Sequence, residues 1–524
     1  MHIFKGAIVA ALDFLSHRKL TASSTATLCR PSVDDQPICK AVTEIVRFIT
    51  FEWTGTVRIV DWSPARTTQS RALAIWPRTL EQLEAAGCAD AFVTAGLHAK
   101  AVSIYAGNRT LARIPFETIA SPFNYLLMLP QSETERLLED HLRTFCVTVE
   151  RETELTDFVD TNDGVSCTLM HGQGRREIVE AAWLIGCDGA HSFVRNRLGM
   201  AFEGDTLPMG FVLADVHVAG LALPPDEPAI FWHADGAVMF FPISRDRYRL
   251  IADLGSVPLH TLNIEEMQRI VDRRGPGGVI LSDPVWLSGF GVNERKVLNY
   301  RKGHVFLAGD AAHIHSPAGG QGMNTGMQDA FNLAGKLARV ERQEARLFLL
   351  DSYSIERSGV ARQILLDSGR MTKVVLLRNQ LAERMRNFFV KQISSIPMFR
   401  RAIANRLSGI LIGYADSPLN TGSATGLSGP EPGQRFLVRR SLERGDLPRF
   451  VLAAKDSAEA QAMIARHSPL LMPEVCLPPD ENGIWLVRPD GYVMAAAKRG
   501  DWAVIDAALN GMAVETSMNV SSPS

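Results

Sequence analysis

The chain has 524 residues, of which 46% are hydrophobic, and its formal net charge is −2. This length and apolar content allow a large buried core and favour two or three domains. The near-neutral charge and the scattered basic residues exclude a strong field that would attract nucleic acid or an anionic membrane. We therefore expect a globular protein without a nucleic-acid partner.

The cysteines and the apolar runs indicate in which cellular compartment the protein is expected. The seven cysteines form neither a CxxC pair nor a metal-ligand spacing, and their odd number argues against a disulfide framework. The N-terminal run GAIVAALDFL is too short to span a bilayer and is interrupted by Asp13, and no other stretch is long enough. We predict a cytoplasmic protein with reduced cysteines, no bound metal and no transmembrane segment.

The first elements follow in chain order. Residues 1–55 form an atypical, irregular segment with one predicted helix over 38–53. The run TVRIVD predicts a strand that ends at Asp61. The run RTLEQLEAAG predicts a helix closed by a glycine, and QSETERLLEDHLRTF predicts a second helix that begins with a capping-box pattern at Ser132 and Glu135.

The pattern changes further along the chain. Between 199 and 298, strands such as AVMFFPIS and RYRLIADL are aromatic-rich and alternating, which predicts a mixed or antiparallel sheet that faces a substrate. A largely helical stretch then runs to 414, and a Pro/Gly/Ser-rich linker covers 415–433. Residues 434–515 are expected to form a separate small α/β domain.

The most informative motif is HVFLAGDAAHIHSPAGGQGMNTGMQDAFNLAGKLA, residues 304–338. A short apolar strand is predicted to end at Gly309 and Asp310, and apolar residues from Met327 onward recur at helical spacing. A glycine loop before a helix start lets backbone N–H groups approach a ligand, so we expect an anionic or oxygen-rich ligand here. The predicted loop holds Pro317, Gly319, Gly320, Gly322, Met323 and Asn324.

Two further aspartates stand at predicted strand ends. Asp61 could accept hydrogen bonds from the hydroxyls of an adenosine ribose, the usual role of an acid at that place in a dinucleotide fold, or it could be a solvated carboxylate. In GCDGAHSFVRNRLG, Asp188 and Gly189 precede a predicted helix. A turn aspartate with a glycine at positive φ is an equally good interpretation of that pair.

Taken in this order, the motifs resemble those of the aromatic-ring flavoprotein monooxygenases, the family of para-hydroxybenzoate hydroxylase and phenol hydroxylase. The resemblance covers about Thr56 to Gly413 and continues into the tail, where WLVRPDGYV is similar to the thioredoxin-like domain that ends several members. It implies that Gly309 and Asp310 hold the flavin ribityl chain, and that Asp188 and Gly189 serve the pyrophosphate and the passage of NAD(P)H. It also places these residues against FAD or its ring: Arg71, Gln131, Pro317, Gly320, Gly322, Met323 and Asn324.

The implied fold is α/β, with a Rossmann-like FAD-binding domain over 56–198 and 299–414 and its substrate domain over 199–298. A thioredoxin-like domain would follow, and since it lacks CxxC we expect packing or a homodimer contact from it. The implied activity is FAD- and NADPH- or NADH-dependent hydroxylation of a phenolic or polyketide-derived aromatic by O2, through a flavin C4a-hydroperoxide, with natural-product tailoring the favoured setting. Pro317 would pack near the reacting edge of the flavin or would only fix the turn.

The N-terminus departs from this family. Members begin with a strand, GxGxxG and a helix about 25 to 30 residues before the ribose-binding acid, and no such pattern precedes Asp61. Three explanations stay open: a mistaken first exon, which the abrupt start of the match favours, a divergent FAD site, or a flavin-free paralogue that serves binding or assembly. A flavin-dependent halogenase is disfavoured because none of the eight tryptophans forms a WxWxIP-type motif.

The sequence does not identify the group that deprotonates the substrate. The segments that could face a pocket contain Tyr125, His233, Tyr248 and Arg249, for each of which an exposed or core position is the expectation. His313 and His315 flank the glycine loop, and both are expected to be histidines satisfied within the loop. Phe240 and Phe241 alternate, so that one belongs to the core and the other could line a cavity.

Overall fold

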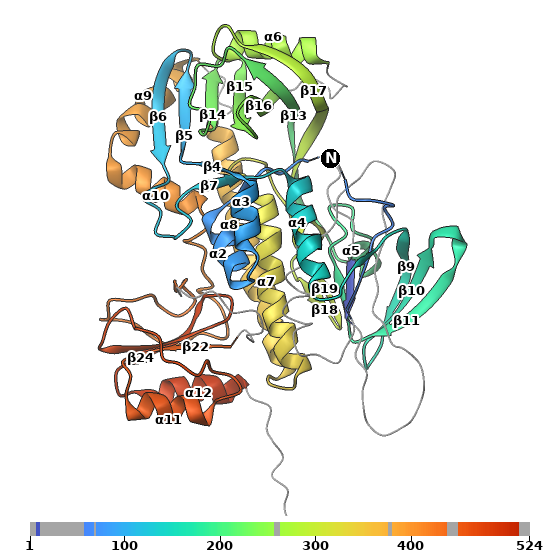
Figure 1. The fold of residues 1–524 in the computed structure, drawn as a ribbon, viewed down its shortest axis with the longest axis vertical. Coiled ribbons are helices and arrows are strands. Elements are labelled where there is room, and N and C mark those ends of the chain that lie inside the picture. The colour runs from blue at the N-terminus through green and yellow to red at the C-terminus, as the bar shows by residue number, and fades with distance from the viewer. Residues whose placement is uncertain are drawn as a thin grey trace, which may run out of the picture.

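The computed structural model describes residues 7–10, 57–67, 70–255, 263–375, 380–437 and 449–512. The helix predicted over 38–53 lies outside the described residues. The described chain is a mixed α/β structure with several sheets, and its long axis is marked by one helix that runs from the middle of the molecule downward (Figure 1).

A six-stranded sheet forms the core around the predicted motifs, in the order β18-β19-β12-β1-β2-β8. Strands β12 (Trp183–Gly186) and β19 (Val305–Leu307) are fully buried and pair in parallel, as expected for apolar strands with both faces covered. Strand β2 (Val57–Val60) runs parallel to β8 (Val149–Glu150). The remaining strands are β1 (Ala7–Ala10) and β18 (Arg301–Lys302).

A second, eight-stranded sheet has the order β20-β17-β13-β16-β15-β14-β5-β6 and lies at the top of Figure 1. Its long central pair, β13 (Glu203–Ala219) and β17 (Ile280–Lys296), is antiparallel, which confirms the sheet predicted for this part of the chain. The other strands are β5 (Ala101–Ala106), β6 (Arg109–Pro115), β14 (Ala229–His233), β15 (Gly236–Pro242), β16 (Arg247–Gly255) and β20 (His313–Ile314). Helix α6 (Ile264–Arg274) covers this sheet and begins with a capping box at Asn263.

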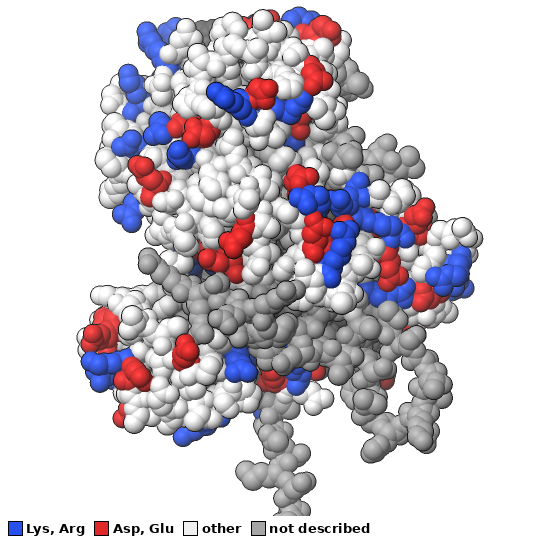
Figure 2. Space-filling view, viewed as in Figure 1, with Lys and Arg blue, Asp and Glu red and all other residues white. Residues whose placement is uncertain are grey.

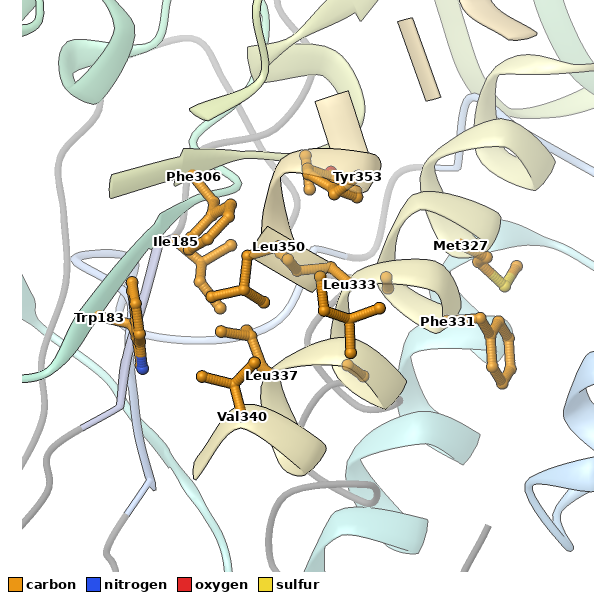
Figure 3. Close-up of a cluster of buried hydrophobic side chains, with 14 of the residues drawn as sticks. Trp183, Ile185, Phe306, Met327, Phe331, Leu333, Leu337, Val340, Leu350 and Tyr353 are labelled. Atoms are coloured by element: carbon orange, nitrogen blue, oxygen red, sulfur yellow. The ribbon is translucent and has the colours of Figure 1, made fainter. Parts of the chain in front are cut away.

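Helix α7 (Gly322–Glu341) follows the glycine loop and is buried over most of its length. Figure 3 shows its apolar side chains, Leu333 and Leu337 among them, against Phe306 of β19 and Tyr353 of α8 (Asp351–Val375). This packing fixes the helix to the end of the parallel strand that precedes the loop. Helices α9 (Gln380–Ser394) and α10 (Pro397–Leu407) continue from α8 and pack beside β6.

The smaller elements complete the frame. Helix α4 (Gln131–Arg143) begins one residue before Ser132 with Pro130 as its N-cap and no side-chain cap, so the predicted capping box does not form. The other elements of this region are α2 (Pro77–Ala85), α3 (Ala89–Ala95), α5 (Phe193–Arg197), a sheet of β3 (Ala74–Ile75), β7 (Leu126–Met128) and β4 (Leu97–Ala99), and a sheet of β9 (Thr153–Asp160), β10 (Val165–His171) and β11 (Arg176–Ala181).

The C-terminal elements form a four-stranded sheet, β21-β24-β23-β22, with two helices at the lower left of Figure 1. Trp485 lies at its centre and is fully buried. The elements are β21 (Thr421–Gly422), β22 (Val451–Ala453), β23 (Gly483–Val487), β24 (Val493–Lys498), α11 (Ala458–Arg466) and α12 (Trp502–Met512).

Charged side chains of both signs are interspersed on the face seen in Figure 2, and neither sign forms a broad field there. Within the described residues, no helix is both long enough and apolar enough to cross a membrane.

Candidate active site

The turn that carries Gly309 and Asp310 is docked on helix α7. Gly309 has φ +59°, a conformation that favours glycine, and its N–H donates to the Asp329 carboxylate at 2.9 Å. A Cβ on Gly326 would lie 3.3 Å from the Gly309 Cα, so the backbone of the turn approaches the helix closely at a second point. Two glycines and one helical aspartate thus set where Asp310 stands.

Asp329 is fully buried and is held by three donors. Besides the Gly309 N–H it accepts from His313 Nε2 at 2.7 Å and from Arg357 Nε at 2.6 Å. Burial alone would raise the pKa of the Asp329 carboxyl, but His313 and Arg357 outweigh it, and the pKa lies below the ordinary value. A charged carboxylate therefore braces the turn, and His313 is a histidine satisfied within the loop, as predicted.

The glycine loop is tied to strand β3 by Asn324. Its side-chain amide donates to the carbonyls of Ala74 and Gly320, both at 2.9 Å, and its carbonyl oxygen accepts from the Trp76 N–H at 2.9 Å. Trp76 Nε1 donates in turn to the Gly319 carbonyl at 2.8 Å. Because all of its hydrogen-bonding groups are used by the backbone, Asn324 shapes the loop from behind.

A cavity of about 1350 Å³ opens in front of this loop. Its opposite wall is apolar and aromatic and comes mainly from the eight-stranded sheet, with Phe211, Trp286 and Phe290 among its residues. The predicted site residues that do not line it are Asp61, Asp188, Gly189, Gly309 and Asn324. The predicted site residues that line the cavity are Arg71, Gln131, Asp310, Pro317, Gly320, Gly322 and Met323.

Arg71 and Asp310 bring opposite charges to one wall of the cavity. Burial lowers the pKa of the Arg71 guanidinium, and the charge of Asp310 opposes this shift. The Arg71 carbonyl accepts from Arg249 Nη1 at 2.8 Å, while the other side of that guanidinium pairs with Asp215 at 2.7 and 2.8 Å. Gln131 accepts from the Ala72 N–H at 3.0 Å, so the backbone around Arg71 is held from two elements.

The Asp188 motif is joined to the Asp310 turn by Arg195. Arg195 Nη1 donates to the Ala311 carbonyl at 3.0 Å and Nη2 donates to the Ala190 carbonyl at 2.8 Å. Asp188 itself accepts from the Val194 N–H at 2.9 Å, and Gly189 has φ +78°. Burial raises the pKa of Asp188 despite these hydrogen bonds. The turn geometry is present, and a cofactor role for the pair stays a prediction.

Asp61 is not solvated. It is fully buried at the end of β2, where it accepts from the Ser63 N–H at 3.1 Å and from Arg151 at 2.6 Å. Burial raises its pKa to about 7, against the attraction of Arg151. The interpretation of Asp61 as an exposed strand-end carboxylate is therefore wrong.

The structure separates the residues that the sequence placed near a pocket by whether they line the cavity. Of the four residues that the sequence placed near a pocket, only Arg249 lines the cavity. Tyr125 stacks on His98 with ring centroids 4.1 Å apart, and His233 lies beside Asp235. Tyr248 belongs to the core of the eight-stranded sheet. Phe240 is buried in the core and its neighbour Phe241 lines the cavity, in agreement with the alternation of the strand.

His315 differs from His313. Its Nδ1 donates to the Ser316 carbonyl at 2.8 Å, which leaves Nε2 as the acceptor of a neutral ring. Nε2 is buried and has no hydrogen-bond partner among the described residues, and the ring lines the cavity. Burial lowers the pKa of His315 to about 4. The expectation of a fully satisfied loop histidine is therefore wrong for His315.

The residues in front of the loop fit the flavin end of FAD. Gly320 has φ +63°, and a Cβ at this position would lie 3.3 Å from the Ala74 Cβ. The loop therefore presents backbone without side chains at the place where a flat ring would approach. The charges of Arg71 and Asp310 stand beside this surface. The same residues would hold the ring and its ribityl chain.

The part of the fold that would bind the pyrophosphate and adenosine of FAD differs from that of an ordinary dinucleotide-binding fold. Strand β1 occupies the central place between β12 and β2 but runs antiparallel to both. In a dinucleotide fold that strand is parallel to its neighbours and leads into a glycine loop at their carboxyl ends. Here the sequence between Ala10 and Val57 contains one glycine, Gly55. The described N-terminal strand therefore does not bring a glycine loop to the pyrophosphate.

Asp329 and Arg357 carry the site and were not singled out by sequence reasoning. Asp329 lies one helical turn after Thr325 in a helix that buries other polar side chains as well, Gln328 and Asn332 among them, so no signal in the sequence set Asp329 apart.

Comparison with known proteins agrees with this geometry. Residues 55–368 match a family model described as an FAD binding domain. The chain is 33% identical to 6-methylpretetramide 4-monooxygenase of Streptomyces rimosus over 87% of this chain and 89% of that protein, and 31% identical to pentachlorophenol 4-monooxygenase of Sphingobium chlorophenolicum over 86% and 92%. The solved structure of OxyS anhydrotetracycline hydroxylase from Streptomyces rimosus superposes with a TM-score of 0.70 at 25% identity, covering 90% of this chain and 97% of that one.

The family match begins at residue 55, where the resemblance in the sequence also begins. It covers the strand that ends at Asp61, the Asp188 motif and the whole glycine loop. The chain belongs to the family of FAD-dependent aromatic-ring monooxygenases.

Proposed function

We propose that this enzyme hydroxylates a phenolic, polyketide-derived aromatic with several fused rings. The observation that carries the proposal is one cavity of about 1350 Å³ that joins the glycine loop to an aromatic wall. The flavin ring and its ribityl chain would take the part of this space beside the loop, and the aromatic wall beyond them offers flat apolar surface to a fused-ring substrate. The names of the relatives, which include a pretetramide and an anhydrotetracycline enzyme, support the same substrate class.

FAD, once reduced by NADPH or NADH, supplies the activated O2 for hydroxylation of an electron-rich ring. The chain contributes the surroundings. The first N–H groups of α7, from Gly322 onward, have no acceptor within the helix and favour negative charge in front of them. The apolar wall excludes water, which strengthens these interactions.

His315 is the residue that we assign to the substrate hydroxyl. It lines the cavity, and its neutral Nε2 is an acceptor without a hydrogen-bond partner among the described residues, so it can take a hydrogen bond from a phenolic hydroxyl. Such a hydrogen bond draws on the O–H bond and makes the ring more electron-rich. Pro317, on the same loop, would border the place where the ring is attacked.

We also propose the division into domains given by the sequence, with a thioredoxin-like fold for the C-terminal sheet and a homodimer as the assembly. The alternation of strands and helices in the C-terminal part supports the thioredoxin-like fold. A cytoplasmic location is supported by the cysteines within the described residues, which are free thiols.

The test of the function is NADPH or NADH oxidation by the FAD-loaded chain with 2-hydroxyanthraquinone and with phenol. We expect faster oxidation and an oxygenated product with the fused-ring compound, and little effect with phenol. Equal stimulation by both, or oxidation without an oxygenated product from either, would contradict the proposed substrate class.

A further inference from the structure

Two side chains that line another part of the cavity each carry a buried nitrogen without a hydrogen-bond partner among the described residues. Arg386 on α9 is 7% exposed and Trp232 on β14 is 5% exposed, and both line the cavity. The guanidinium carbon of Arg386 lies 4.3 Å from the centre of the Trp232 ring. The two side chains are therefore in direct contact, in a stacked cation–π arrangement.

The hydrogen bonds of Arg386 leave one nitrogen unused. Nη1 donates to the carbonyls of Val374 at 3.2 Å and Val375 at 3.0 Å, and Nε donates to the Asn387 side chain at 3.1 Å. Nη2 is buried without a hydrogen-bond partner, and its approach to a Glu383 oxygen is 3.8 Å, beyond hydrogen-bond reach. These three hydrogen bonds hold the side chain in place, and Nη2 takes part in none of them.

Trp232 has the same deficit. Its Nε1–H is buried and has no hydrogen-bond partner among the described residues. An indole nitrogen and a guanidinium nitrogen are both donors only, so neither can satisfy the other. Leaving a buried donor unpaired is destabilising, and more so when the group is charged.

Apolar side chains pack around Trp232, and those that also line the cavity are Ile104, Ile230, Met239, Val375 and Val390. Burial lowers the pKa of Arg386, opposed by the charge of Glu383, yet a guanidinium keeps its proton at neutral pH. A fixed positive charge and a second donor thus belong to side chains that line the cavity beside apolar residues.

We propose that Arg386 Nη2 and Trp232 Nε1 form a subsite for an oxygen of the substrate. The group that fits two adjacent donors is a ketone or phenolate oxygen on a ring other than the one that is hydroxylated. This inference rests on the proposed function, and it narrows the substrate class to fused-ring aromatics that carry such an oxygen.

The test uses a pair of probes that differ in that oxygen. 2-Hydroxyanthraquinone and anthracen-2-ol share three fused rings and one phenolic hydroxyl, and only the first has ketone oxygens. Their dissociation constants are measured by calorimetry on the FAD-loaded full chain. We expect about ten-fold tighter binding of the quinone, because a hydrogen bond to a charged donor contributes about that much.

Two variants localise the preference. Arg386→Met is expected to remove the preference for the quinone while changing the affinity for anthracen-2-ol less than about two-fold. Trp232→Phe keeps the ring and removes only the N–H, so we expect it to lower the preference about three-fold. Arg384→Met, an exposed arginine on the same helix, is the matched control and should keep the full preference.

The subsite is overturned if the unaltered chain binds both probes equally, or if Arg386→Met weakens both to the same extent, which would mark a packing role. If Arg386→Met fails to fold, Trp232→Phe decides, because an unchanged preference in that variant contradicts the subsite. Failure of the proposed function looks different. In that case neither probe binds the unaltered chain and neither stimulates NADPH or NADH oxidation, and the subsite falls with it.

Discussion

Arg488, in the turn after strand β23, donates to both oxygens of Glu356 on helix α8, at 2.6 and 3.0 Å. Lys336 of α7 donates to the same carboxylate at 2.6 Å, and Glu356 and its partners are buried. Burial alone would raise the pKa of Glu356, but Arg488 and Lys336 hold it well below its ordinary value. The C-terminal sheet is thereby joined by buried charges to the helix that carries the glycine loop.

Replacing Glu356 with Gln should destabilise the chain strongly. Lys336 would stay buried without its anion and Arg488 would keep only its pair with Asp490, and breaking a buried pair in this way costs about 3 to 5 kcal/mol. The free energy of unfolding from urea titration measures the effect. Glu481→Gln, which removes an exposed ion pair with Lys455, is the control and should change stability by less than about 1 kcal/mol. A small loss for Glu356→Gln would mean that water reaches the cluster.

Replacing Asp329 with Asn should weaken FAD binding. An amide has one acceptor oxygen where the carboxylate has two, so it cannot hold Gly309, His313 and Arg357 together. We expect the FAD dissociation constant to rise at least about ten-fold, which corresponds to one lost charge-assisted hydrogen bond. Fluorescence titration of the apoprotein with FAD gives this constant.

Glu341→Gln is the matched control for Asp329→Asn. Glu341 is a largely buried acid on the same helix, accepts from Trp183 Nε1, and lies far along α7 from the loop. It should leave the FAD dissociation constant within about two-fold of the unaltered chain. Equal weakening in both variants would show that general loosening of α7, not the brace on Gly309, limits FAD binding.

Glu341 should also give stability a pH dependence. Burial raises its pKa to about 7 from 4.5, so the folded state binds the proton more tightly than the unfolded state. Stability therefore falls as the pH rises from about 4.5 to about 7, by about 2 kcal/mol after allowance for partial exposure. Between pH 5 and pH 8, Glu341→Gln should gain that amount relative to the unaltered chain in urea titrations. A constant difference across this range would contradict the shifted pKa.

The N-terminal segment should limit FAD affinity. Strand β1 runs antiparallel to both neighbours, and one glycine lies between it and β2. Replacing residues 1–55 with a segment that supplies a strand, a GxGxxG loop and a helix should tighten FAD binding by at least about ten-fold, since backbone N–H groups would then reach the pyrophosphate. An unchanged FAD dissociation constant in the chimera would mean that this chain binds the cofactor in a divergent way.

Local patterns in the sequence determined the strand, loop and helix at the centre of the site. Strand β19 ends at Leu307 and α7 begins at Gly322 because an apolar run, a cluster of glycines and a 3.6-residue period are each encoded by neighbouring residues. The antiparallel sheet between 199 and 298 was predicted in the same way. That β5 and β6 extend this sheet was not predicted, because strand pairing across a hundred residues leaves no local signal.

Only the tertiary structure decided which polar groups are satisfied. Sequence spacing does not tell that His313 bonds to Asp329 while Nε2 of His315 has no hydrogen-bond partner in the described part of the chain, although the two histidines are two residues apart. It also cannot bring Arg386 to Trp232. A hydrogen bond depends on a few ångströms and on burial, and both arise when distant elements pack. The sequence by itself determined the family and the flavin loop, and packing determined which side chains face the substrate.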